Sequence, residues 1–306
     1  MSATVYEIIT ERVSAALQAG TVPWRRPWRD TDAPRNLEGR LYRGINVFML
    51  LMAGYESPLW MTYNQAKEHG GTIKKGEKGT PVILWKVSPY TKVEADGSES
   101  RRNSFVLRYF TVFNLSQTEG VKVPPRVAAG LVLSGDGADP IEEADRVVVG
   151  MPNRPAISWG GDRAYYRPSA DAVQMPTADT FASPSARYAT LFHELGHSTG
   201  HKSRLDRPGV TDAHSFGSEP YSREELVAEM TAAFLCGQTG IAPAILDNSA
   251  AYIASWLGKL REDPKALVVA AGQAQKAADY ILGKAAAEAE PVTEAETTSE
   301  PISQAA

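Results

Sequence analysis

One segment in the second half of the chain constrains the fold more than any other. It contains the pattern His193-Glu194-x-x-His197 inside a stretch with its own helix signals. Ser183 suits an N-cap, Pro184 suits the first helical position, and apolar residues recur at helical spacing. On a helix, residues four apart lie on one face, so the two imidazoles converge and Glu194 lies beside them. Two chance histidines on a solvated face are a poor alternative in a chain with five histidines in 306 residues. The pattern predicts a metal-binding helix.

Few residue types are available to complete such a site. The chain has a single cysteine, Cys236, which excludes a cysteine-rich zinc site, so the remaining protein ligand must be a histidine or a carboxylate. Zn²⁺ suits this donor set, and another divalent metal would also fit. The candidates for the third ligand are His201, His214, Glu225 and Glu229.

Two of these candidates fit best. Glu225 and Glu229 lie one turn apart on the next predicted helix, so one can bind the metal while the other accepts a hydrogen bond from a ligating histidine. The competing interpretation of Glu225 is a capping box with Ser222. His201 continues the i+4 series, but Gly200 is expected to end the metal helix before it.

The chemistry that this donor set favours is peptide-bond hydrolysis. A metal held in this way polarises a carbonyl and lowers the pKa of water, and Glu194 would take the proton and pass it to the leaving amine. An edge strand usually holds the peptide by antiparallel pairing. We place that strand at Arg163–Tyr166 or at Asp171–Met175, both shortly before the metal helix.

The N-terminal part of the chain has an α+β pattern. Apolar spacing predicts helices over 3–19 and 44–55. Two runs rich in β-branched and aromatic residues, 81–87 and 105–113, predict antiparallel strands. We therefore expect an α+β first domain that covers residues 1–125.

The second domain, residues 151–284, is predicted to be mostly helical. Its helices are expected over 183–200, 222–236, 248–261 and 263–283. Before it, residues 126–150 are expected to contain the start of the second domain and a linker, which begins at a Pro-Pro step and across which few contacts are expected. The last stretch, residues 285–306, has five acids and no bases, which is typical of a disordered acidic tail.

The first 125 residues also have the composition of a nucleic-acid-binding surface. They carry 17 Lys and Arg against 12 Asp and Glu, whereas the rest of the chain carries 15 against 24. Cations that neutralise phosphates, interleaved with aromatic rings on which bases stack, are typical of sequence-tolerant binding to single strands. A basic face over an aromatic core explains any one of these residues, but the cluster favours DNA. The residues expected to contact single-stranded DNA are Trp24, Arg25, Arg26, Trp28, Arg43, Asn46, Trp60, Lys74, Lys75, Lys78 and Trp85.

Several motifs make the chain, up to about residue 284, resemble the ArdC antirestriction proteins of conjugative plasmids. They are Pro23-Trp24-x-x-Pro27-Trp28, Tyr42–Asn46, Trp60–Thr62, Lys75–Thr80, His193–Gly200 and Glu224–Glu229. The resemblance implies an N-terminal single-stranded-DNA-binding domain and a C-terminal zincin-like metallopeptidase domain with a small sheet. It also implies that His193, His197 and Glu225 are the metal ligands and that Glu194 is the catalytic acid/base.

Two functions of different class follow. In one, the protein coats incoming single-stranded DNA and protects it from restriction, with the zincin-like domain as a scaffold or partner-binding module. In the other, it is an active zinc endopeptidase that DNA binding directs to an unknown protein substrate. No stretch approaches the roughly 20 apolar residues of a membrane span, so we expect a cytoplasmic protein without a membrane partner.

Overall fold

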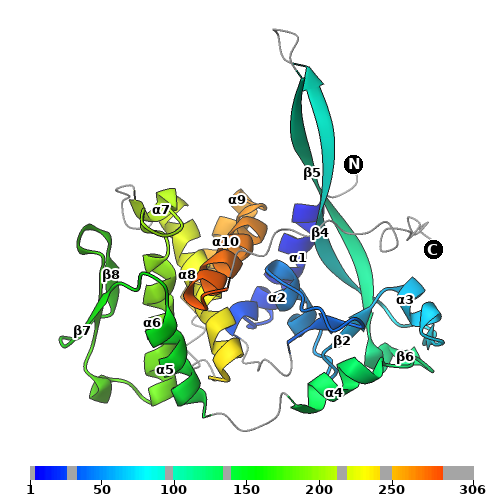
Figure 1. The fold of residues 1–306 in the computed structure, drawn as a ribbon, viewed down its shortest axis with the longest axis horizontal. Coiled ribbons are helices and arrows are strands. Elements are labelled where there is room, and N and C mark those ends of the chain that lie inside the picture. Colours follow the sequence, from blue (N-terminus) through cyan, green and yellow to red (C-terminus); the bar gives the residue numbers. More distant parts are fainter. Residues whose placement is uncertain are drawn as a thin grey trace.

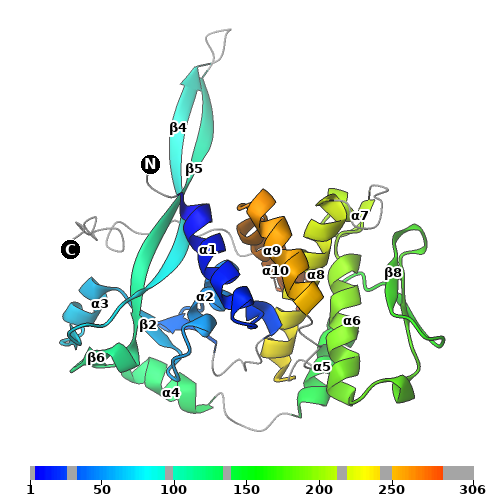
Figure 2. The same cartoon turned by 180° about the vertical axis from the view of Figure 1, so that it is seen from behind.

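The structure, a computed structural model, describes residues 4–25, 33–93, 99–133, 139–211, 219–241 and 250–284. Figures 1 and 2 show a mostly helical half, a half built around a small curled sheet, and a two-stranded arm that projects from the latter. The predicted α+β class is confirmed. The predicted acidic tail, residues 285–306, lies outside the described residues.

The N-terminal half is built on a four-stranded sheet of order β1-β2-β5-β4, with a second pair β3-β6. Its elements are α1 (Val5–Gln18), η1 (Pro23–Arg25), β1 (Arg35–Asn36), α2 (Ile45–Met52), β2 (Leu59–Met61), α3 (Tyr63–Glu68), β3 (Thr72–Ile73), β4 (Thr80–Val93), β5 (Glu99–Asn114), η3 (Leu115–Gln117), β6 (Thr118–Glu119) and α4 (Pro125–Leu133). The predicted helices correspond to α1 and α2, and the predicted strands to parts of β4 and β5. These strands continue toward the arm tip, beyond the predicted limits, because their alternating residues keep pairing.

The C-terminal half packs helices against a three-stranded sheet of order β7-β9-β8. Its elements are α5 (Pro140–Gly150), β7 (Ala156–Trp159), β8 (Tyr165–Arg167), η4 (Pro168–Ala170), β9 (Ala172–Met175), η5 (Ala178–Thr180), α6 (Pro184–Ser198), α7 (Pro208–Thr211), α8 (Glu219–Thr239), α9 (Ala250–Glu262) and α10 (Ala266–Ile281). The metal helix begins as predicted, because the Ser183 hydroxyl accepts a hydrogen bond from the Ala186 N–H at 3.1 Å.

Two predicted helix starts are wrong. Helix α8 begins at Glu219, so Ser222 lies inside it and cannot be its N-cap, which removes the capping-box interpretation of Glu225. The same helix runs past Gly237 and ends before Gly240, which has the positive φ of +73° that a terminating glycine adopts. Helix α10 begins at Ala266 rather than next to Asp263.

Within residues 126–150 the expected start of the second domain corresponds to α5, but most of the expected linker is helix α4. Helix α4 packs Val127 against Leu37, Leu59 and Met61 and so belongs to the N-terminal half. Helix α5, capped by Asp139, buries its apolar face in the core of the C-terminal half. The two halves therefore follow each other with little chain between their packed elements.

The expectation that few contacts cross between the halves is also wrong. Helices α1 and α2 share one hydrophobic core with α8, α9 and α10. Phe48 of α2 stacks on Phe234 of α8 with ring centroids 4.9 Å apart, and Trp24 meets Trp256 edge to face at 5.9 Å. Apolar area removed from water stabilises by roughly 25 cal/mol per Å², so this contact makes the halves depend on each other.

Among the described residues, no helix combines the length and the apolar character that crossing a bilayer requires.

We predict that Phe234→Ala lowers the free energy of unfolding by about 3–5 kcal/mol, since it opens a cavity between the halves. Urea titration followed by circular dichroism measures this change. A single transition for both halves is expected. The control is Val269→Ala on the exposed face of α10, which should change stability by less than about 0.5 kcal/mol. Two separate transitions, with only one shifted, would contradict the shared core.

Candidate metal centre

The metal helix α6 and helix α8 approach each other closely at Gly196. A Cβ atom at this position would lie 3.2 Å from the Cα of Ala228 and 3.2 Å from the Cβ of Thr231, closer than side chains normally pack. Glycine removes that obstacle and lets the two backbones come together. The approach places Glu225, one turn earlier on α8, opposite the two histidines.

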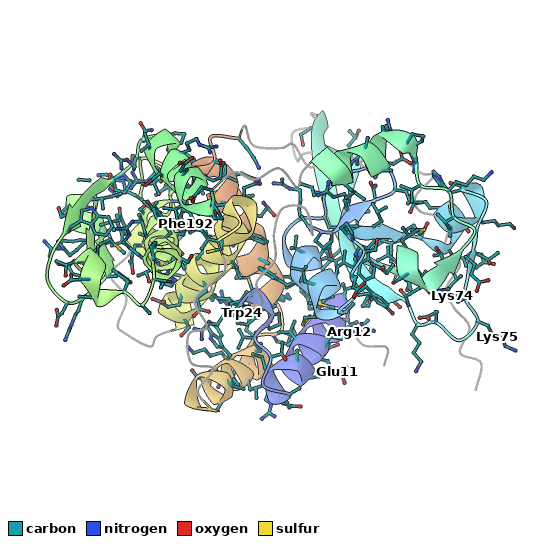
Figure 3. The ribbon with its side chains drawn as sticks, turned by 90° about the horizontal axis from the view of Figure 1, so that it is seen from below. Glu11, Arg12, Trp24, Lys74, Lys75 and Phe192 are labelled. Atoms are coloured by element: carbon teal, nitrogen blue, oxygen red, sulfur yellow. The ribbon has the colours of Figure 1, made fainter. Side chains whose placement is uncertain are left out.

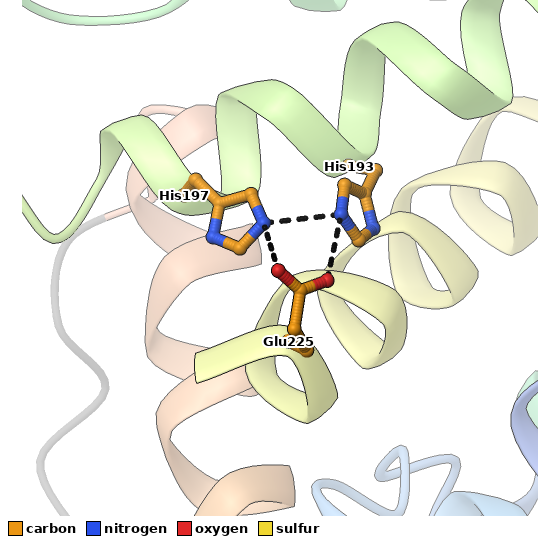
Figure 4. A group of neighbouring side chains, drawn as sticks. All are labelled: His193, His197 and Glu225. Carbon is orange, nitrogen blue, oxygen red and sulfur yellow. Dashed lines mark hydrogen bonds and ion pairs between the residues drawn. The ribbon is translucent and has the colours of Figure 1, made fainter. Parts of the chain in front are cut away.

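The three side chains converge on one point (Figure 4). The Nε2 atoms of His193 and His197 lie 3.0 Å apart, and the Glu225 carboxylate oxygens lie 3.5 Å from His193 Nε2 and 3.6 Å from His197 Nε2. Ligands held about 2.0–2.1 Å from one tetrahedral ion lie about 3.3 Å apart. The observed distances straddle that value, so two imidazole nitrogens and a carboxylate fit a divalent metal with one position left for water or substrate.

A buried ion pair between Glu224 and Arg207 supports His197 at the ring nitrogen that faces away from the ligand cluster. Glu224 Oε1 lies 3.5 Å from His197 Nδ1, and its other oxygen accepts a hydrogen bond from Arg207 Nε at 3.0 Å. Arg207 also donates to Thr199 Oγ1 at 2.6 Å and to the Gly196 carbonyl at 2.9 Å. Burial raises the pKa of Glu224, but the hydrogen bonds from His197 and Arg207 outweigh this and hold it below its usual value.

With Glu225 as the ligand, Glu229 was the residue expected to support a ligating histidine, but Glu224 occupies that role. Glu229 instead accepts a hydrogen bond from Trp24 Nε1 at 2.7 Å and lies 3.8 Å from the Arg25 guanidinium. Burial lowers the pKa of His193, but the hydrogen bond with Glu225 and the charges of nearby glutamates, Glu229 included, raise it overall. A residue of the N-terminal half therefore holds a carboxylate that acts on a metal-site histidine.

The expected acid/base, Glu194, is 7% exposed and lies beside β8. Burial raises the pKa of its carboxyl, while the neighbouring imidazoles and a hydrogen bond from the Tyr166 backbone N–H lower it by less. Strand β8 is at the edge of its sheet and β9 is central, so of the two segments proposed for peptide pairing only Arg163–Tyr166 contains an edge strand.

Strand β8 is held in place by a buried arginine. Arg204 pairs with Asp171, which also accepts a hydrogen bond from the Tyr166 hydroxyl at 2.8 Å. The same guanidinium donates to the carbonyl of Ser198, the last residue of α6, at 2.7 Å. The edge strand is thereby tied to the helix that carries the histidines.

A cavity of about 650 Å³ lies next to His193, between η1, α6 and α8. Its walls combine apolar groups with the Arg25 and Glu229 pair. The residues that line it are Trp24, Arg25, Thr180, Phe181, Ala182, Ala186, Ala189, Thr190, His193, Glu229, Ala232, Ala233 and Cys236. This space is large enough for a peptide side chain beside the metal site.

The other histidine candidates do not join the cluster. Among the described residues, the group that can share a metal consists of His193, His197 and Glu225. His201 follows the end of α6, and its Nδ1 lies 2.8 Å from Ser203 Oγ. His214 lies outside the described residues.

Two of the tryptophans expected to stack on bases are part of the core. Trp24 and Trp60 are each 2% exposed, so neither offers a ring face to a base. Figure 3 shows Trp24 between the two halves, far from the loop of Lys74 and Lys75. The apolar rings of Trp24 and Trp60, and the hydrogen bond from Trp24 to Glu229, explain why these two side chains are buried.

The polar residues in the same set have varied positions. Asn46 is structural, since its side chain donates to the Ile83 carbonyl at 2.8 Å and accepts from the Ile83 N–H at 2.7 Å. Arg43 pairs with Asp279, and Lys74 donates to the Ser116 carbonyl at 2.8 Å. The rest comprise Arg25, which lies beside Glu229, Lys75 and Lys78, which are exposed, Trp85, which is on β4, and Arg26 and Trp28, which lie outside the described residues.

The fold and the converging ligands define a protein with a zincin-like metallopeptidase domain. The family model described as "Zincin-like metallopeptidase" matches residues 142–273, and that of the "N-terminal domain of anti-restriction factor ArdC" matches residues 3–113. Two crystal structures of the antirestriction protein ArdC from plasmid R388 are similar. The metal-free one is 38% identical with a TM-score of 0.69, covering 91% of this chain and 97% of that chain. The Mn(II)-bound one is 37% identical with a TM-score of 0.70, covering 92% and 98%. The chain belongs to the ArdC antirestriction family.

Curated relatives extend this similarity. An uncharacterized protein, y4eC of Sinorhizobium fredii, is 36% identical over 90% of this chain and 91% of its own length. Two proteins named DNA primase TraC from Escherichia coli are 38% and 36% identical over 90% of this chain, which spans only 27% and 20% of their lengths.

We predict that alanine at His193, His197 or Glu225 abolishes binding of a divalent metal, because two donors do not hold the ion as three do. Metal content of the purified chain and calorimetric titration with Zn²⁺ and Mn²⁺ measure the loss. His201→Ala is the matched control and should bind as the parent does. Loss of metal in this control together with retention in Glu225→Ala would overturn the assignment of the third ligand.

We predict that Glu224→Gln weakens metal binding by about 10–100-fold, because His197 loses its charged support. The same change leaves Arg207 buried without its counter-charge and should cost about 3 kcal/mol of stability. Calorimetry well below the unfolding temperature separates the two effects. The control is Glu262→Gln at the exposed end of α9. Parent-like metal affinity in Glu224→Gln would contradict the supporting role.

Proposed function

We propose that this protein binds single-stranded DNA and protects incoming DNA from restriction, and that its centre at His193, His197 and Glu225 holds Zn²⁺. The observation that carries the proposal is the match to an antirestriction protein over 91% of this chain, which includes both halves rather than one. The positive balance of the first 125 residues supports a polyanionic partner for that half. The shared core then makes the DNA-binding half and the metal half a single stable body.

A second candidate, an active zinc endopeptidase, is favoured by one specific arrangement. Glu194 lies next to the ligand cluster and accepts the Tyr166 N–H from the edge strand β8. A pure scaffold needs the ligands but no buried carboxylate at this position. A bound metal would supply Lewis acidity toward a carbonyl and a lower pKa for water.

The chain's own groups have defined tasks in that reaction. Glu194 would accept a proton from the attacking water and deliver it to the leaving amine. The edge strand β8 would hold the peptide backbone by antiparallel pairing, and the cavity beside His193 would receive a side chain. The Glu224 and Arg207 pair would keep the His197 ring oriented.

Glu194→Gln distinguishes the two candidates. This change keeps the shape and hydrogen bonding of the side chain but removes its ability to take a proton, so folding, metal content and DNA affinity should match the parent. We expect the variant to protect DNA as the parent does, since a coat on the incoming strand needs no cleavage step. Any hydrolysis of peptides should fall by about 10²–10⁴-fold.

The measurement is a restriction-protection assay on the full chain, alongside metal analysis and DNA binding. Glu262→Gln serves as the control for a neutral surface change. A Glu194→Gln protein that binds single strands normally and yet fails to protect would overturn shielding in favour of the peptidase.

A further inference from the structure

The arm formed by β4 and β5 is the most prominent projection of the molecule (Figures 1 and 2). The two strands pair without interruption from Thr80 opposite Val112 to Val93 opposite Glu99. At its base, Val82 and Ile83 are buried in different cores, one on each face of the ribbon. Leu107 still packs against one of these cores, and beyond it the ribbon extends away from both (Figure 1).

The register sorts the residues of the arm onto two different faces. In an antiparallel ladder, directly paired residues lie on the same face and successive pairs alternate. One face therefore carries the even-numbered positions of both strands, and the other carries the odd-numbered positions. We call them the even face and the odd face.

The even face is basic and polar. It carries four cations and no acid among the paired residues 80–93 and 99–112. Beyond the buried base, its positions hold Leu84, Lys86, Ser88, Tyr90, Lys92, Ser100, Arg102, Ser104, Val106 and Arg108. The odd face is largely apolar, with Trp85, Val87 and Phe105, and it carries one cation, Arg101, and one acid, Glu99.

We propose that the even face of this arm binds the sugar-phosphate backbone of single-stranded DNA. The inference rests on the proposed function and assigns its DNA-binding surface. The cations extend from the Leu84–Arg108 pair to Lys92, about 27 Å at the usual rise of about 3.4 Å per residue. Serine and tyrosine also occupy even-numbered positions, and these residue types respectively bind phosphates and stack on bases.

The twist of the arm suits a flexible single strand. Two-stranded ribbons twist more strongly than larger sheets, so the even-numbered positions wind around the arm. A single strand can follow this winding because it is flexible. The assignment also replaces the buried Trp24 and Trp60 as contacts, and it locates Trp85 on the odd face.

Two neighbouring arginines provide a matched test. Arg102 lies on the even face opposite Tyr90, and Arg101 lies on the odd face opposite Thr91. Arg102→Gln and Arg101→Gln remove the same charge from the same strand, one residue apart. Binding of the full chain to a fluorescent oligo(dT) of about 20 nucleotides is measured by anisotropy over a range of salt concentrations, with a duplex of equal length alongside.

Losing one phosphate contact with a single strand reduces the slope of log K against log salt by about 0.7, which is roughly a 5-fold loss of affinity at about 0.1 M salt. We expect this loss for Arg102→Gln and a slope change of about 2 for Lys86→Gln/Lys92→Gln/Arg102→Gln. Arg101→Gln should match the parent. Metal content and the unfolding temperature should stay unchanged in all variants, because the arm is remote from the metal centre.

Each other outcome overturns the inference in a recognisable way. Equal losses for Arg101→Gln and Arg102→Gln would mean that overall charge and not the even face matters. Parent-like binding by the triple variant would place the DNA elsewhere while leaving the proposed function intact. A parent chain that does not bind the oligonucleotide would overturn the proposed function itself, and the assignment of the arm with it.

Discussion

The close approach of α6 and α8 at Gly196 is the constraint on which the metal centre depends. The backbones of the two helices nearly touch there, since even a methyl group would lie 3.2 Å from the Cα of Ala228. At this separation a short glutamate side chain on α8 reaches both histidines on α6. The adjacent Glu224 then meets His197, and Arg207 binds Glu224 and the Gly196 carbonyl together. One small residue thus sets the distance between the ligands and the geometry of their support.

The second organising feature is the contact between the two halves. The N-terminal family match, residues 3–113, includes α1 and α2, yet these helices complete the core beneath α8 and α10. Trp24 contributes both to this core and to the hydrogen bond that orients Glu229. The matched families therefore divide the sequence at a place where the packed structure is continuous. A change in the N-terminal half can reach the metal site through packed side chains and a single carboxylate.

The structure also separates the two chemistries in space. The metal centre lies among α6, α8 and the edge strand β8, whereas the basic even face lies on an arm that projects from the opposite half (Figure 1). Carboxylates surround the first site, and cations line the second. Opposite charge at the two places would keep a polyanion bound at the proposed surface away from a centre that needs its acidic residues for metal binding.

What the sequence determined by itself was the chemistry that depends on near neighbours along the chain. The pairing of His193 with His197 and the place of Glu194 follow from helix periodicity, and the cap at Ser183 follows from local hydrogen bonding. The runs of β-branched and aromatic residues at 81–87 and 105–113 likewise predicted the strands that became parts of β4 and β5. Only the tertiary structure decided contacts between distant segments: that Glu224 rather than Glu229 supports the centre, and that Trp24 and Trp60 are buried instead of stacking on bases. The reason is physical, because composition gives a tryptophan or a glutamate the same local signal wherever it lies, and its role is set by the partners that packing brings to it.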